Sequence, residues 1–116
     1  MQPGVVGTNK PFAFQERSFA FAREIVGFAR VVAERGYIFR RLAGQLVDAG
    51  GSVGANLEES ADAQTKPDFI SKQFIALKEA RETRFWLRLI AVSEPTFAPQ
   101  ATPLIAEASE FVAMLT

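Results

Sequence analysis

The segment from Phe69 to Val92, FISKQFIALKEARETRFWLRLIAV, constrains the fold of this chain more than any other stretch. Its apolar residues recur at the three- and four-residue spacing of an α-helix. They also lie on more sides of that helix than one neighbouring surface can cover. We therefore predict a helix that packs in a bundle on one face and contributes to an oligomer on another.

Two residue types that are absent from the sequence exclude several kinds of catalytic and metal site. The 116 residues suit one domain with a core of its own, and they include neither cysteine nor histidine. A disulfide framework, a thiolate metal site, a Ser-His-Asp triad and a Glu-x-x-His di-iron site are therefore excluded. The adjacent Glu58 and Glu59 would point about 100° apart on a helix, so they cannot act on one atom together. We expect no enzyme activity, no metal and no cofactor.

Charge is balanced overall but distributed in blocks. The net charge is zero, whereas a dedicated nucleic-acid-binding protein is usually basic. Residues 48–64 carry four acidic and no basic groups, and residues 65–92 carry six basic and three acidic groups. We expect these blocks to neutralise one another across helices. No apolar run reaches the length of a membrane span, and no signal peptide is evident, so we expect a cytoplasmic protein.

Turn and capping signals divide the chain into four helices. Residues 1–11 are expected to form a flexible arm, and 12–116 a bundle with helices near 12–35, 37–60, 67–93 and 102–115. Gly36 suits the end of the first helix, and Pro67 and Pro103 suit first helical positions. At Gly50-Gly51 the second helix either breaks or continues, and the unbroken apolar period favours continuation. We predict an all-α, antiparallel up-down-up-down four-helix bundle that assembles as a ring.

Helical spacing in the first helix predicts which residues face the core. One stripe fits this spacing and consists of Phe19, Ala22, Ile25, Val26, Ala29, Val32 and Ala33. Phe21 and Phe28 form a second apolar edge beside it. In the third helix, Ile75, Trp86, Leu89 and Ile90 fall away from the expected core seam. We predict that these six residues outside the two core faces form an oligomer interface, because aromatic residues anchor interfaces. An extended core beneath the N-terminal arm is the alternative.

Polar residues beside the core suggest an internal network. Gln45, Ser52, Asn56 and Glu59 lie on one side of the second helix, and Arg81, Arg84 and Arg88 form a row on the third. We predict that the arginines pair with Glu58 and Glu59 inside the bundle, because buried polar groups need partners. The alternatives are a pocket lined by the second-helix residues and a phosphate site along the arginine row.

Several short motifs resemble a known family. SVGANLEE at 52–59, KPDFI at 66–70, IALKEARET at 75–83 and WLRL at 86–89 are similar to bacterial four-helix-bundle proteins related to the products of 23S rRNA intervening sequences. The resemblance covers roughly residues 18–92. It implies a homopentameric ring, and one relative is an accessory protein of retroelements that works with a reverse transcriptase. Family positions map to Asn56, Glu59, Arg81 and Arg88, without a catalytic role.

Two functions follow as hypotheses. The first is a non-enzymatic scaffold or adaptor that presents a ring surface to another protein. The second is association with RNA or DNA through basic residues gathered by symmetry, with Arg17, Arg40 and Arg41 as candidate contacts.

Overall fold

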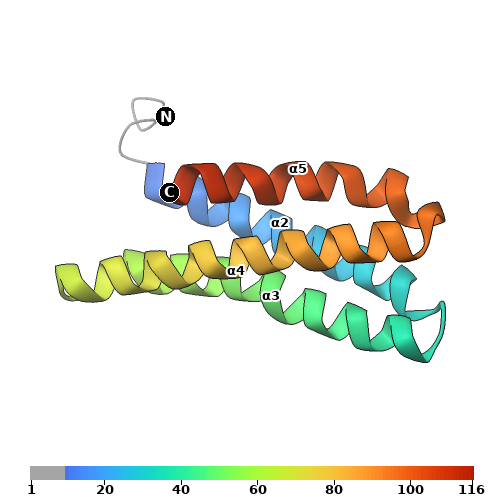
Figure 1. Ribbon diagram of the computed structural model, residues 1–116. Helices are drawn as coiled ribbons and strands as arrows, with labels where there is room; N and C mark the ends of the chain where they lie inside the picture. Colours follow the sequence, from blue (N-terminus) through green and yellow to red (C-terminus); the bar gives the residue numbers. More distant parts are fainter. Residues whose placement is uncertain (1–9) are drawn as a thin grey trace.

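The computed structural model describes residues 10–116, and these residues form four long helices joined by short connections. The helices are α2 (Lys10–Ala33), α3 (Tyr37–Ala61), α4 (Lys66–Ser93) and α5 (Ala98–Leu115), with a short 3-10 helix η1 (Pro95–Phe97) before α5. Figure 1 shows that each helix returns alongside the one before it, so that α2 begins near the end of α5. The all-α prediction is confirmed for the described residues.

The helices pack in chain order around one core. α3 lies between α2 and α4, and α4 lies between α3 and α5. The core includes the buried side chains of Ile25, Leu46, Val53, Leu87 and Phe111. In Figure 1 the α3–α4 hairpin extends past the ends of α2 and α5. None of the helices in the described residues is long and apolar enough to cross a membrane.

The connections use the residues expected at helix ends. Gly36 has φ 134°, a conformation that residues with a Cβ rarely adopt, and it separates α2 from α3. Thr65 caps α4, because its Oγ1 accepts a hydrogen bond from the Asp68 backbone N–H at 3.2 Å. Of the predicted arm, residues 1–9 lie outside the described part, while Lys10 and Pro11 already belong to α2.

The helix α3 continues through Gly50-Gly51, as the apolar period predicted. A Cβ at Gly50 would lie 2.9 Å from Ile25 Cγ2, so the missing side chain lets α2 approach α3 closely. Gly54 plays a milder version of this role, because its Cβ would meet the Ser18 backbone oxygen at 3.5 Å. The two glycines therefore mark the contact between α2 and α3.

The face that α2 buries overlaps the predicted stripe only in part, because Ile25, Ala29 and Val32 are buried as predicted but other members of the stripe are not. Phe19 and Val26 are exposed, whereas Phe21 and Phe28 are buried in the core. The residues that face inward keep a four-three spacing: Phe14, Ser18, Phe21, Ile25, Phe28 and Val32. Ser18 obscures this seam in the sequence, because a polar residue at a core position breaks the apolar pattern. Packing decides between two apolar faces, and the aromatic face is buried because its rings contact the segment 97–111.

The start of α5 also differs from the prediction, which placed the last helix near 102–115 with Pro103 in its first turn. The chain makes the turn η1 and enters α5 at Ala98, so Pro103 lies inside the helix. Phe97 explains this, because it is buried against Phe28 and Phe39 with ring centroids at 5.8 and 6.1 Å. Burying this ring draws the segment against the bundle and places the helix start before the proline.

Candidate interaction surface

Each buried polar side chain donates a hydrogen bond within its own helix, and Ser60 Oγ also accepts one from Gln73 Nε2 of α4 at 3.1 Å. Ser18 Oγ donates to the Gln15 carbonyl at 3.0 Å, and Ser60 Oγ donates to the Leu57 carbonyl at 2.9 Å. Thr83, which is fully buried, donates to the Glu79 carbonyl at 2.7 Å. A hydroxyl that bonds its own backbone needs no partner from another helix. These three residues therefore support packing and do not form a reactive group.

The predicted polar residues of α3 do not form a network inside the bundle, although Glu59 pairs with Lys72 of the neighbouring helix α4 at the surface. Asn56 Nδ2 donates to the Ser52 backbone carbonyl at 2.8 Å, a contact within α3. Glu59 is exposed and pairs with Lys72 at 2.8 Å, which raises the pKa of Lys72 through the hydrogen bond and the nearby charge. Gln45 and Glu58 are also exposed. The prediction that this line of residues lies inside the bundle is wrong for Gln45, Glu58 and Glu59, whereas Ser52 and Asn56 are half-buried.

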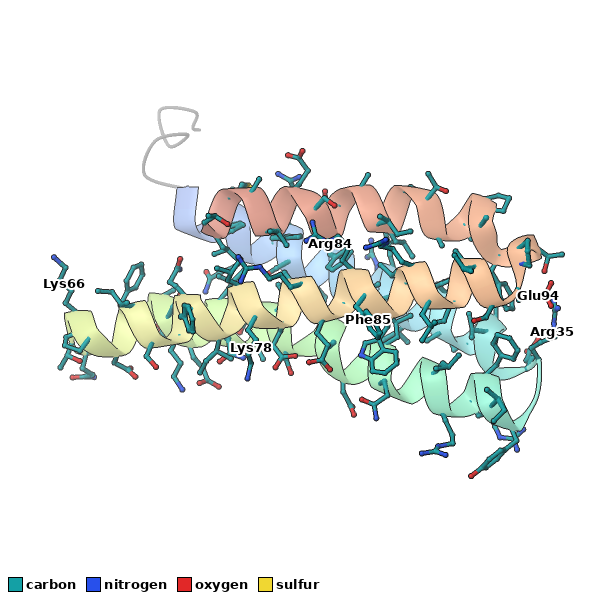
Figure 2. All side chains as sticks on the ribbon, viewed as in Figure 1. Arg35, Lys66, Lys78, Arg84, Phe85 and Glu94 are labelled. Atoms are coloured by element: carbon teal, nitrogen blue, oxygen red, sulfur yellow. The ribbon has the colours of Figure 1, made fainter. Side chains whose placement is uncertain are left out.

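The arginine row of α4 is likewise not an internal ionic cluster. Arg81 and Arg88 are exposed, and in residues 13–116 neither takes part in an ion pair. Arg84 is half-buried and donates to Ser109 Oγ of α5 at 3.3 Å, and Figure 2 shows it between these helices. The rotation of α4 about its own axis explains why these arginines are not internal. Its buried side contains Ala76, Ala80, Thr83, Leu87 and Ile90. The arginines lie to one side of these residues.

Ion pairs join other parts of the bundle. Arg17 Nε and Nη2 donate to the two carboxylate oxygens of Glu107 at 2.7 and 2.8 Å, which connects α2 to α5. The hydrogen bonds from Arg17 lower the pKa of Glu107. Arg35 pairs with Glu94 at 2.8 Å where two connections meet. The pKa of Glu94 is lowered mainly by a hydrogen bond from Thr96 and also by Arg35.

The predicted oligomer interface divides into buried and accessible residues. Phe21, Phe28 and Ile90 are buried within the chain's own core, so the prediction that they face a neighbouring copy is wrong. They fill the core seams described above, which leaves no surface on them for a partner. Trp86 and Ile75 are half-buried. Leu89 is 37% exposed and remains available for contact.

The surface that sequence reasoning missed is the solvent side of α4. Four large apolar side chains are more than half exposed there: Ile70 (55%), Phe74 (66%), Phe85 (54%) and Val92 (79%). Together with Leu89 we call these residues the α4 outer face. Lys78, Arg81 and Arg88 are interspersed with them. Figure 2 shows Lys78 and Phe85 on the opposite side of α4 from Arg84.

Helical spacing is the signal in the sequence that could have indicated the α4 outer face. Ile70 and Phe74 are four residues apart, and Phe85 and Val92 are seven apart, so each pair shares a side of the helix. Lys78 continues the same line between the two pairs. A line that mixes large apolar residues with exposed cations fits a contact surface better than a core, because an unpaired charge is costly to bury.

One edge of α4 carries two neighbouring carboxylates. Glu79 is half-buried, and burial raises its pKa, with a further contribution from Glu82. Glu82 accepts a hydrogen bond from Trp86 Nε1 at 3.2 Å. The Trp86 ring in turn packs edge-on against Phe85, with centroids 5.0 Å apart. Phe85 of the α4 outer face is thus held against the ring of Trp86.

A hollow of about 550 Å³ lies where the α3–α4 hairpin extends past the other helices. Its lining is largely apolar and includes Phe14, Leu57, Phe69 and Met114. Ser52 and Asn56 do not line it, so it is not the pocket considered for the polar residues of α3. In residues 13–116 no three acidic side chains are grouped closely enough to hold a metal ion.

Comparison with known proteins identifies the family. The family model for the 23S rRNA-intervening sequence protein matches residues 11–116. A similar solved structure is a protein of unknown function from the S23 ribosomal protein family of Bacteroides thetaiotaomicron. It is 32% identical, with a TM-score of 0.79 over 87% of this chain and 93% of that chain. No curated protein matches. The chain therefore belongs to the 23S rRNA-intervening sequence protein family.

Proposed function

We propose that this protein is a non-enzymatic scaffold that functions as a homo-oligomer, with the α4 outer face as its contact surface. The observation that carries the proposal is the exposure of Ile70, Phe74, Phe85 and Val92 along one helix. Single exposed apolar residues are normal at a protein surface, but several large ones along the same side of one helix favour a binding surface. The nearby arginines fit this role, because arginine is also enriched at interfaces.

A ring is the form of assembly that we favour. The family resemblance implies a pentamer, and a ring forms when one surface of each copy binds a different surface of the next. Such a ring would repeat the remaining exposed surfaces around its circumference. A scaffold or adaptor role for another protein follows from that repetition, because several weak contacts act together.

Light scattering on the purified chain tests self-assembly. We expect a mass several times that of the 12.7 kDa chain. A double variant, Phe74→Ser with Phe85→Ser, should shift the mass towards that of a monomer. Phe19→Ser is the matched control, because Phe19 is an equally exposed aromatic residue on α2. A monomeric natural chain at micromolar concentration would refute the proposal.

Association with RNA or DNA is the second candidate. Arg40 and Arg41 are adjacent and exposed near the start of α3, and the Arg40 guanidinium lies 5.8 Å from the Tyr37 ring centroid. Basic groups beside an exposed aromatic ring are suited to a phosphate backbone and a stacked base. Arg17 fits less well, because it is paired with Glu107.

A gel-shift titration at low and raised salt tests this candidate. We expect a salt-sensitive shift with structured RNA that weakens when Arg40 and Arg41 are replaced by glutamine. Arg23→Gln with Arg30→Gln is the control, since both arginines are exposed on α2. The absence of any shift at low salt would exclude nucleic-acid association of this kind.

A further inference from the structure

The hollow beside the α3–α4 hairpin has walls that the fold already holds in place. Phe14 of α2 stacks on Phe111 of α5, with ring centroids 5.6 Å apart, and Leu57 of α3 is buried. Phe69 of α4 also lines the hollow, and this residue is 44% exposed. The hollow has a volume of about 550 Å³, which lies within the range of pockets that bind ligands. We call it the apolar hollow.

Three of the polar side chains that line the apolar hollow already have partners. Gln73 Nε2 donates a hydrogen bond to Ser60 Oγ at 3.1 Å. Arg17 donates to both carboxylate oxygens of Glu107, and its Nη1 donates to Met114 Sδ at 3.7 Å. An occupant therefore gains little from offering polar groups to these side chains, whereas apolar side chains gain free energy by leaving water.

A second hollow, of about 320 Å³, adjoins the apolar hollow, because Gln15 lines both. Its other lining residues are Glu16 and Phe19 of α2 and Glu58 of α3, and we call it the acidic hollow. Phe19 is 65% exposed, and in residues 13–116 neither carboxylate takes part in an ion pair. Two carboxylates beside an exposed aromatic ring suit a lysine or arginine side chain, which can pair with the charges and lie over the ring.

We propose that the apolar and acidic hollows together bind a linear peptide segment of a partner protein. Apolar side chains of the segment fill the apolar hollow, and a lysine or arginine a few residues away lies between Glu16, Phe19 and Glu58. A linear segment fits better than a compact small molecule, because one chain carries both kinds of side chain to two adjoining surfaces. None of the residues of the α4 outer face lines either hollow, so this site does not depend on self-assembly.

The charges around the acidic hollow favour the same occupant. Glu58 also borders a third hollow, whose lining includes Asp62, Asp68 and the ion pair between Glu59 and Lys72. Apart from that neutral pair, every charged side chain that lines the acidic hollow or this third one is a carboxylate. Grouped charges of one sign attract an oppositely charged partner and speed its approach. The acidic block of residues 48–64 thus directs a basic segment towards the two hollows.

Fluorescence anisotropy with three labelled peptides tests the site. The first peptide carries leucine, phenylalanine and leucine, then glycine and two lysines. The second has glutamates in place of the lysines, and the third has serines in place of the apolar residues. We expect saturable binding of the first peptide that weakens as salt is raised, and about tenfold weaker binding of the other two. Equal binding of all three would overturn the proposal. So would no binding of the first, the result expected if another part of the chain or a second copy fills the hollows.

A substitution in the apolar hollow tests the apolar contact. Phe69→Ser should weaken binding of the first peptide about tenfold, because it removes a large apolar side chain from the lining. Val31→Ser is the matched control, since Val31 is 41% exposed and lines neither hollow. Circular dichroism should show unchanged helix content in both variants. Equal weakening by the two substitutions, or by neither, would overturn the apolar contact.

Substitutions in the acidic hollow test the charged contact. Glu16→Gln with Glu58→Gln should weaken binding of the first peptide about fivefold and reduce its dependence on salt. Glu24→Gln with Glu34→Gln is the control, because both glutamates are exposed and line neither hollow. Weakening by the control pair as large as by the first pair would overturn the contact.

Charge reversal gives a result that a loss of folding cannot imitate. Glu16→Lys with Glu58→Lys should bind the glutamate peptide more tightly than the lysine peptide, the opposite of the natural order. A variant that still prefers the lysine peptide would overturn the proposed site. Light scattering on the same samples reports self-assembly, so a failure of peptide binding is distinguished from a failure of the oligomer.

Discussion

The close approach of α2 to α3 makes a quantitative prediction for Gly50→Ala. In a helix interior, alanine is favoured over glycine by about 1 kcal/mol. At Gly50 the new Cβ would lie 2.9, 3.2 and 3.3 Å from three carbon atoms of Ile25, a fully buried side chain. Rotating that side chain cannot clear the clash, because its own Cβ is the atom at 3.3 Å.

The expected magnitude follows from two opposing terms. Overpacking a core costs about 1–3 kcal/mol, so the net change at Gly50 is a destabilisation of about 0–2 kcal/mol. Gly27→Ala is the matched comparison, because Gly27 is a helical glycine with no atom within 4 Å of its added Cβ. It should stabilise the chain by about 1 kcal/mol. The difference between the variants isolates the clash at about 1–3 kcal/mol.

Urea unfolding followed by circular dichroism measures both variants. The free energies of unfolding should be compared at one protein concentration, because assembly makes stability depend on concentration. A Gly50→Ala variant that is stabilised as much as Gly27→Ala would refute the tight contact between α2 and α3.

Three further substitutions have expected outcomes that urea unfolding can measure. Arg17→Met should lower stability by about 0.5–1 kcal/mol near neutral pH, because the ion pair that it removes is partly exposed and screened by solvent. Arg17 lowers the pKa of Glu107 in the folded chain, so the ion pair stabilises the fold at pH values above the pKa of Glu107 in the unfolded chain. This stabilisation should disappear as the pH falls through the pKa of Glu107 in the folded chain. A difference in stability between the natural chain and Arg17→Met that stays the same in acid would contradict this. Burial raises the pKa of Glu79, so the natural chain loses stability as the pH rises and this carboxyl ionises. Glu79→Gln should therefore stabilise the chain at neutral pH. It should have no effect at a pH low enough to protonate the carboxyl of Glu79. Gly36→Ala should lower the free energy of unfolding by about 1–3 kcal/mol, because the φ of 134° at Gly36 is strained for a residue with a Cβ. An unchanged free energy of unfolding would exclude such strain.

Local signals in the sequence were sufficient for most of the helices and their boundaries. The cap at Thr65, the turn at Gly36 and the unbroken period across Gly50-Gly51 each depend on residues within a few positions of one another. Such short-range interactions act the same way whatever the helices pack against. For this reason the all-α fold and the continuous α3 could be predicted without tertiary information.

Only the tertiary structure decided which side of each helix is buried. Both α2 and α4 have apolar residues around most of their circumference, so spacing alone permits several rotations. On α2 the choice depended on aromatic partners from the distant segment 97–111, which buried Phe21 and Phe28 and exposed Phe19. On α4 it turned Arg81 and Arg88 outward with the exposed apolar residues. The candidate contact surface is thus a consequence of packing between residues far apart in the chain.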